Sequence, residues 1–84
     1  MFKDKTLLIT GGTGSFGSTV LDRFVDSEIG EIRIFSRDEK KQEDLRIKYG
    51  SDKIRFYIGD VRDMSSVRPA VSGVDYIFHA AALK

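Results

Sequence analysis

The chain of 84 residues is long enough for one small domain with a core of its own. Its formal charge of +1, from 14 Lys and Arg against 13 Asp and Glu, argues against nucleic-acid binding because neither sign dominates. The lack of cysteine excludes disulfides and thiolate metal sites, and a single histidine cannot form a zinc centre. The apolar runs are too short to cross a membrane, and residues 1–5 are too polar for a secretory leader. We therefore expect a cytoplasmic protein without membrane partners.

The first predicted elements are a strand, a glycine-rich turn and a helix. The apolar run at residues 6–10 has no polar face and ends where four glycines occur within seven residues: Gly11, Gly12, Gly14 and Gly17. Glycines let the backbone approach a phosphate, and the N–H groups of the following helix turn attract the anion. The pattern Gly12-x-Gly14-x-x-Gly17 is the general dinucleotide fingerprint, and Gly11-x-x-Gly14-x-x-Gly17 resembles that of short-chain dehydrogenase/reductase proteins.

Further strands and helices alternate along the rest of the chain. We expect helices at about 15–25, 39–49 and 64–71, and strands at 31–35, 54–58 and about 75–80. Pro69 should keep the third helix short, and Asp63 should cap it. Right-handed crossovers then predict an α/β, Rossmann-type doubly wound parallel sheet with strand order 3-2-1-4, incomplete in this chain. The last strand is apolar on both faces, so we expect residues 1–84 to be the amino-terminal part of an NAD(P)-binding domain.

Three local details are also predicted. In the charged helix at 39–49, Leu45, Ile47 and Tyr49 are the apolar residues left to bury. His79 lies within an apolar strand and is interpreted as a packed core histidine, not as a catalyst or ligand. The exposed edge of that last strand should let the isolated chain self-associate.

The end of the second strand indicates which dinucleotide is bound. In dinucleotide folds an acid about 20 residues past the glycines binds the ribose 2′-hydroxyl, whereas a base accommodates a 2′-phosphate. Arg37 lies 20 residues after Gly17 and is followed by Lys40 and Lys41, which favours NADP. Asp38 offers a competing NAD interpretation if the strand extends one residue further. A structural alternative is that Ser36 and Glu39 form a capping box and that the lysines are solvated.

The residues after the third strand give a weaker indication. Asp60 follows Gly59 at the carboxyl end of that strand, the side on which open α/β sheets bind ligands. Its carboxylate could accept a hydrogen bond from an adenine amino group, or it could simply stabilise a turn. The small residues after the fourth strand would let a nicotinamide or its ribose approach the backbone.

Four blocks of sequence together resemble one superfamily. These are TGGTGSFG at 10–17, IFSRDEK at 34–40, GDVRD at 59–63 and HAAALK at 79–84. They look like the extended short-chain dehydrogenase/reductases, and within these the inverting UDP-N-acetylglucosamine 4,6-dehydratases of bacterial polysaccharide biosynthesis. The resemblance implies bound NADP that oxidises C4 of a UDP-sugar, loss of water across C5 and C6, and return of the hydride to C6 with inversion at C5. It further implies a 4-keto-6-deoxy product for capsule or O-antigen synthesis and a homo-oligomer.

The resemblance also implies roles for individual residues. The pyrophosphate contacts fall on the glycine segment, the 2′-phosphate contacts on the end of the second strand, the adenine contacts after the third strand and the nicotinamide contacts after the fourth. In that order the cofactor-binding residues are Gly11, Thr13, Gly14, Ser15, Phe16 and Gly17, then Ser36, Arg37 and Lys40, then Asp60 and Val61, then Ala80, Ala81, Ala82 and Lys84. Lys84 is also placed near the substrate. No residue is assigned to metal binding.

One departure from the superfamily concerns the catalytic pair Tyr-x-x-x-Lys, in which the lysine lowers the tyrosine pKa. The chain has this spacing only at Tyr49 and Lys53, where Gly50 and the residues after it end the helix on the side of the sheet away from ligands. We interpret the pair as structural, which leaves the chain without catalytic residues and inactive on its own. A UDP-sugar 4-epimerase of the same superfamily, or a non-catalytic dinucleotide-binding or interaction module, remain the alternatives.

Overall fold

The computed structural model describes residues 3–11 and 15–79, and for residues 15–18 it describes the backbone alone. The elements in chain order are β1 (Thr6–Thr10), α1 (Ser15–Val25), β2 (Glu31–Ser36), α2 (Glu39–Tyr49), β3 (Ile54–Ile58), α3 (Met64–Val71) and β4 (Tyr76–His79). Most bounds agree with the sequence prediction, although β2 is one residue longer than expected and β4 is shorter.

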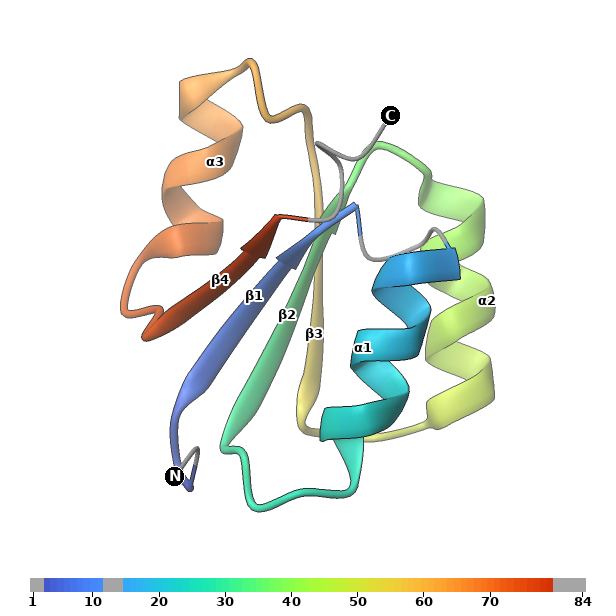
Figure 1. Ribbon diagram of the computed structural model, residues 1–84. Coiled ribbons are helices and arrows are strands. Elements are labelled where there is room, and N and C mark those ends of the chain that lie inside the picture. The colour runs from blue at the N-terminus through green and yellow to red at the C-terminus, as the bar shows by residue number, and fades with distance from the viewer. Residues whose placement is uncertain (1–2, 12–14, 80–84) are drawn as a thin grey trace.

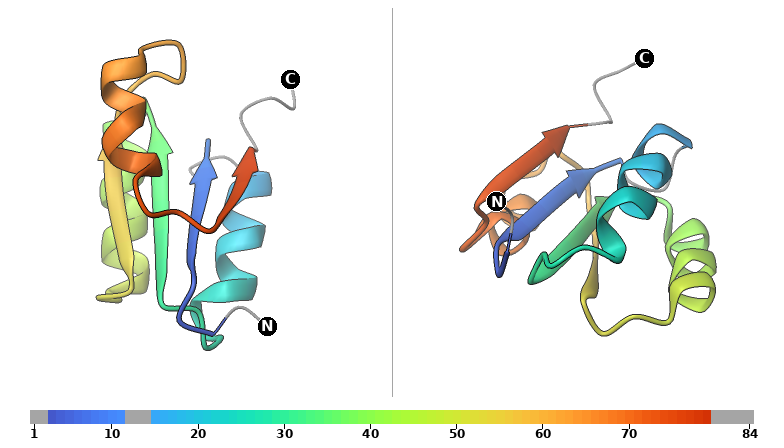
Figure 2. Two further views of the ribbon diagram at one scale, coloured as in Figure 1. Left: turned by 90° about the vertical axis from the view of Figure 1, so that its left-hand side faces the viewer. Right: turned by 60° about the horizontal axis from the view of Figure 1, so that its bottom comes forward.

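The four strands form one parallel sheet in the order β3-β2-β1-β4. Figure 1 shows α1 and α2 on one face of the sheet and α3 on the other, and the carboxyl ends of all strands meet at one edge. Figure 2 shows the common direction of the strands from two further sides. The predicted Rossmann-type α/β fold with order 3-2-1-4 is therefore confirmed.

Each face of the sheet has its own apolar cluster because successive side chains of a strand point to opposite faces. The larger cluster lies under α1 and α2, and its buried members are Leu7, Ile9, Leu21, Ile29, Ile32, Ile34, Leu45 and Ile54. The smaller one lies under α3 and consists of Leu8, Phe35 and Ala70, with Tyr57, Val67, Val71 and Val74 packed against it. Together the clusters hold the helices against the strands β1, β2 and β3, whose carboxyl ends form the candidate site.

Helix α2 differs from the sequence prediction in which side chains it buries. Leu45 is buried as expected, but Ile47 is 73% exposed and the polar Gln42 is only 1% exposed. The capping box considered as an alternative for Ser36 and Glu39 does not form, because β2 continues through Ser36. Asp38 is the N-cap instead, and its carboxylate accepts a hydrogen bond from the Lys41 amide at 3.0 Å.

Helix α3 is short, as predicted from the presence of Pro69, and its N-cap is Asp63, as predicted. Its carboxyl end is tied to the sheet by Arg33, a charged residue in the centre of β2. The Arg33 guanidinium donates to the carbonyl oxygens of Ala70 at 2.9 Å and Ser72 at 2.7 Å. A cation at this position also complements the negative end of the helix dipole, which explains why a central strand carries an arginine.

The prediction that His79 is packed in the core is wrong. The fourth strand lies at the edge of the described sheet, and the His79 side chain is exposed there instead of being packed in the core. Its ring nitrogen Nδ1 is hydrogen-bonded to the hydroxyl of buried Thr10, its neighbour on β1. The apolar side chain of Ile77 is likewise exposed on this strand.

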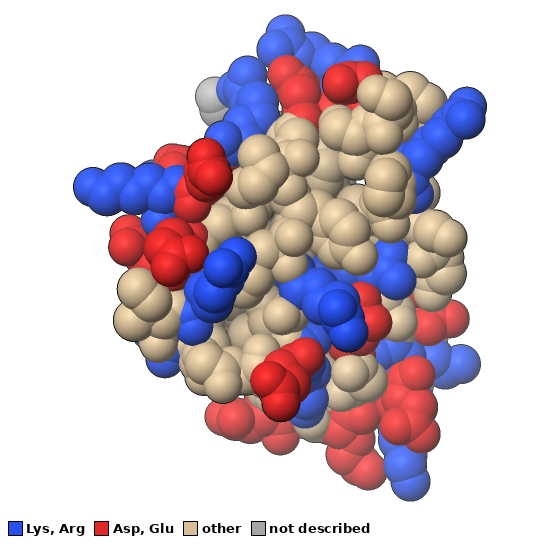
Figure 3. Space-filling view, turned by 180° about the vertical axis from the view of Figure 1, so that it is seen from behind, with Lys and Arg blue, Asp and Glu red and all other residues tan. Residues whose placement is uncertain are grey.

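The charged side chains are distributed without a dominant sign. The face in Figure 3 carries Lys and Arg interspersed with Asp and Glu around an uncharged centre, in agreement with the formal charge of +1. Over residues 3–11 and 15–79, no helix is long and apolar enough to span a bilayer. Within the same ranges, no group of three or more His, Asp or Glu could hold a metal ion.

Candidate functional site

The candidate site is the carboxyl edge of β1, β2 and β3. Backbone hydrogen bonds connect the residues that follow β1 and β3 to the end of β2. The Gly11 amide donates to Phe35 O at 2.8 Å, and the Gly59 amide donates to Ser36 O at 3.0 Å. Gly11 has a φ of 71°, a backbone conformation that favours glycine, and it directs the chain out of β1. The start of the glycine segment and the segments after β2 and β3 are therefore held side by side.

The structure brings together at one edge all the predicted binding residues that it describes. At this edge lie the Gly11 backbone, the first turn of α1 at 15–17, and the segments that carry Ser36, Arg37, Lys40, Asp60 and Val61. The first N–H groups of a helix lack partners within it, so the start of α1 presents donors here. The remaining predicted residues lie outside the described residues: Thr13, Gly14, Ala80, Ala81, Ala82 and Lys84.

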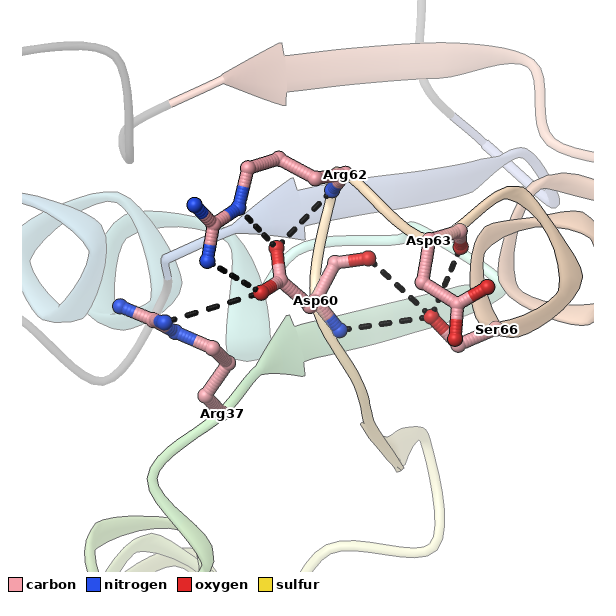
Figure 4. Close-up of polar contacts among 5 residues, drawn as sticks. All are labelled: Arg37, Asp60, Arg62, Asp63 and Ser66. Atoms are coloured by element: carbon pink, nitrogen blue, oxygen red, sulfur yellow. Dashed lines mark hydrogen bonds and ion pairs between the residues drawn. The ribbon is translucent and has the colours of Figure 1, made fainter.

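Asp60 is held between two arginines (Figure 4). Arg62 contacts it most closely, with Nη2 2.9 Å from Oδ2 and its backbone amide 2.9 Å from Oδ1. Arg37, the residue after β2, lies near the same carboxylate, with Nη1 3.6 Å from Oδ2. Its side chain is 70% exposed. The turn role considered for Asp60 is confirmed, since its carboxylate accepts from the amide two residues on. The sequence analysis did not identify Arg62 as its partner.

These contacts lower the pKa of Asp60 to about 2, chiefly through the hydrogen bonds from Arg62, with a smaller effect of the Arg37 charge. Asp60 is therefore ionised throughout the physiological pH range. Any stability that its contacts provide is present above the unfolded-state pKa near 3.8 and is lost as the pH falls toward 2.

We predict that the Asp60 carboxyl titrates with a midpoint near pH 2, and that Arg62→Ala raises this midpoint because the largest stabilising contact is lost. Carboxyl carbon chemical shifts followed by NMR during an acid titration would measure both values. Arg46→Ala removes an exposed arginine from α2 that does not pair with Asp60, and it should leave the midpoint unchanged. A midpoint near 4 in the unsubstituted protein would contradict the arrangement in Figure 4.

The position of Asp60 is fixed by α3. Ser66 in the first turn of that helix lies against the bend after β3, where its hydroxyl accepts from the Asp60 amide at 3.3 Å. The same hydroxyl is 3.1 Å from Asp60 O and 2.9 Å from Asp63 O, which compete for its single hydrogen. A Cβ at Gly59 would lie within 3 Å of Ser66 in this helix and of the Phe35 ring, so the bend has no room for a larger residue.

Ser36 is the second polar centre of the site. Its hydroxyl oxygen accepts from the Asp38 amide at 3.2 Å and from the Gln42 amide nitrogen Nε2 at 3.1 Å. Gln42 was not recognised in the sequence analysis, although it precedes Leu45 and Tyr49 by three and seven residues and so shares their helical face. That spacing was the available signal, and it was missed because glutamine is usually exposed.

This edge offers several groups that favour anions. The Ser36 hydroxyl, the exposed Arg37 guanidinium and the start of α1 belong to segments that meet at this edge, and Lys40 is exposed in the first turn of α2. Asp38, on which the NAD interpretation rested, is engaged as the N-cap of α2. Because β2 extends to Ser36, one residue further than expected, the condition for that interpretation is met, but the cap already explains an acid at this position.

The Tyr49 and Lys53 pair has a structural role, as predicted. Tyr49 donates its hydroxyl hydrogen to Asp22 on α1, and Lys53 Nζ donates to Val25 O at 3.2 Å and Ser27 O at 2.8 Å, where α1 ends. Burial, then the hydrogen bond to Asp22, raises the pKa of Tyr49 to about 12, the opposite of what a catalytic tyrosine needs. Both residues lie at or beyond the carboxyl end of α2, away from the candidate site.

We predict that Tyr49→Phe lowers the free energy of unfolding by about 1 kcal/mol, the usual net contribution of one hydrogen bond, and leaves nucleotide binding unchanged. Urea unfolding and a dinucleotide titration of the same variant would measure the two quantities. Asp22→Asn retains an acceptor for the Tyr49 hydroxyl and should cost less. A loss of dinucleotide affinity in Tyr49→Phe would show that the structural interpretation is incorrect.

The sheet order and the clustered strand ends define this chain as a Rossmann-type α/β domain. Within that class, it belongs to the family described as polysaccharide biosynthesis protein, which matches residues 7–84.

Relatives and solved structures agree with this assignment. The chain is 67% identical over 88 aligned residues to a "UDP-glucose 4-epimerase" of Rickettsia canadensis and 66% identical to that of Rickettsia prowazekii, and it spans about a quarter (26%) of the length of each. The X-ray structure of Pen from Bacillus thuringiensis is 40% identical, with a TM-score of 0.93 over 100% of this chain and 26% of that one. A short chain dehydrogenase from Bacillus anthracis, 21% identical, has a TM-score of 0.78 over 92% of this chain and 35% of its own, which shows the shared fold.

Proposed function

We propose that residues 1–84 are the amino-terminal, cofactor-binding part of an NADP-dependent enzyme that oxidises a UDP-sugar at C4. The observation that carries this proposal is the meeting of Gly11, Ser36 and Arg37 at the carboxyl edge of a parallel sheet. Membership of the polysaccharide biosynthesis family and the names of the Rickettsia relatives support a sugar nucleotide as the substrate. On this proposal the protein works in the cytoplasm as a homo-oligomer.

The described residues fit a dinucleotide with a 2′-phosphate. Arg37 holds an exposed guanidinium near the end of β2, and the hydroxyl of Ser36 has both lone pairs engaged, so its hydrogen is available to an anion. Asp60 and Val61 would flank the adenine, and the start of α1 would face the pyrophosphate. The nicotinamide supplies the hydride acceptor, while these residues bind and orient the adenosine half.

Two reactions share their first step, oxidation at C4, and differ in the step after it. The sequence blocks at 34–40 and 79–84 resemble the inverting UDP-N-acetylglucosamine 4,6-dehydratases, whose product has lost one water. The names of the relatives at 66–67% identity instead favour a UDP-sugar 4-epimerase, whose product is an isomer of the substrate. We propose the 5-inverting dehydratase and keep the epimerase as the second candidate on the strength of those names.

The deciding experiment uses the full-length protein that contains this chain. It is incubated separately with UDP-N-acetylglucosamine and UDP-glucose, and the products are analysed by mass spectrometry and NMR. Loss of one water with a 4-keto signal supports the dehydratase, whereas a product of unchanged mass inverted at C4 supports the epimerase. If the protein binds a dinucleotide and converts neither sugar, the non-catalytic binding module is favoured. Failure to bind NADP or NAD overturns the proposed function itself.

A further inference from the structure

Gln42 is a buried polar residue behind the predicted 2′-phosphate site. Its amide nitrogen Nε2 donates to Tyr57 O at 2.9 Å and to the Ser36 hydroxyl oxygen at 3.1 Å, with a longer contact of 3.5 Å to Ser36 O. The amide oxygen Oε1 is buried and has no partner among the described residues. Rotating the amide by 180° would place Oε1 against Tyr57 O, another acceptor, so these contacts fix the donor end toward Ser36.

The orientation of Gln42 decides what the Ser36 hydroxyl can do. A hydroxyl has two lone pairs and one hydrogen, and at Ser36 the lone pairs are taken by the Asp38 amide and by Gln42 Nε2. Among the described residues, none accepts the hydrogen of the Ser36 hydroxyl. The hydroxyl is therefore left as a donor, which suits an ionised phosphate because its oxygens only accept.

The same arrangement disfavours a 2′-hydroxyl. A ribose hydroxyl needs an acceptor for its own hydrogen, a need that an acid normally meets in NAD-binding folds. At Ser36 the oxygen has no lone pair left to offer, so Ser36 cannot meet that need.

We propose that Gln42 is a positioning residue that makes Ser36 a dedicated hydrogen-bond donor to the 2′-phosphate and so contributes to selection of NADP over NAD. This inference rests on the proposed function, because it assumes that the adenosine half of a dinucleotide lies at the end of β2. It assigns a role to a side chain that does not itself touch the cofactor.

The test measures binding of NADP, NAD, ADP and adenosine 2′,5′-bisphosphate to the full-length protein by calorimetry. Gln42→Met keeps the length of the side chain and removes its donors. We expect it to weaken NADP and the bisphosphate about 3- to 10-fold, the range for one neutral hydrogen bond, and to change NAD and ADP less than about twofold. Ser36→Ala removes the donor itself and should weaken NADP and the bisphosphate at least as strongly, and the double variant should lose no more than Ser36→Ala alone. Ser36→Thr, which retains the hydroxyl, is the matched control and should keep the preference.

The outcomes separate this proposal from the function on which it rests. Equal affinity of the unsubstituted protein for NADP and NAD would contradict NADP selection as a whole, and the role of Gln42 with it. A clear NADP preference that Gln42→Met leaves intact would overturn the role of Gln42 alone. Equal losses for NADP and NAD would assign Gln42 a purely structural role through Tyr57, and additive losses in the double variant would show that it does not act through Ser36. Ser36→Ala keeps the bond to Tyr57 and tests the hydroxyl even if Gln42→Met does not fold.

Discussion

Arg37→Ala is expected to weaken NADP binding about 10- to 100-fold and to leave NAD binding nearly unchanged. A hydrogen bond to a charged group contributes about 1.5–3 kcal/mol, and the Arg37 guanidinium is free to turn toward a phosphate because its side chain is 70% exposed. Its contact with Asp60 is long, at 3.6 Å, and Arg62 keeps that carboxylate paired at 2.9 Å when Arg37 is absent. The substitution therefore removes a phosphate ligand without leaving Asp60 unpaired.

Arg55→Ala is the matched control for this prediction. Arg55 lies near the amino end of β3, is 66% exposed and pairs at 3.8 Å with Glu31, so its removal changes the net charge equally. Titrations with NADP and NAD at the same ionic strength would separate a local contact from a general field effect. An equal loss of NADP affinity in both variants, or a parallel loss of NAD affinity in Arg37→Ala, would remove Arg37 from the selection of the cofactor.

The features that could be predicted from sequence are those encoded locally. Apolar runs that are broken by glycines predict the strands, and Asp63 and Pro69 predict where α3 begins and that it is short. The right-handed crossover rule predicts the order of the strands in the sheet. Each of these inferences needs only neighbours along the chain and the handedness of the connections.

The features that could not be predicted depend on which element covers a residue. Gln42 and Ile47 lie on the same charged helix, and the structure buries the polar residue and exposes the apolar one because Gln42 faces the ends of β2 and β3. His79 is exposed although its strand is apolar, because β4 lies at the edge of the described sheet. Similarly, the pairing of Asp60 with Arg37 joins the segments that follow β3 and β2, and no pattern of neighbouring residues in the sequence predicts it.

Gly59→Ala is expected to lower the free energy of unfolding by about 1–3 kcal/mol, the usual cost of overpacking a well-packed position. An added Cβ would lie 2.7 Å from Cβ and Oγ of Ser66 and 2.9 Å from Cε1 of Phe35. Neither neighbour can move freely, since Ser66 belongs to α3 and Phe35 is 1% exposed. The strain should therefore displace the bend that carries Asp60. We expect the unfolding temperature and the affinity for NADP both to fall.

A double-mutant cycle with Ser66→Gly tests the cause of that loss. Ser66→Gly removes the two atoms nearest to the added Cβ, and it also loses helix propensity, about 0.5 kcal/mol, and the contacts of Ser66 with Asp60. If the clash is responsible, the double variant is more stable than the sum of the single losses predicts, by more than the usual additivity error of about 0.5 kcal/mol. Strict additivity would mean that Gly59 is required for some reason other than the space beside α3. A positive coupling would show that α3 packs against the bend after β3 so closely that the position requires glycine.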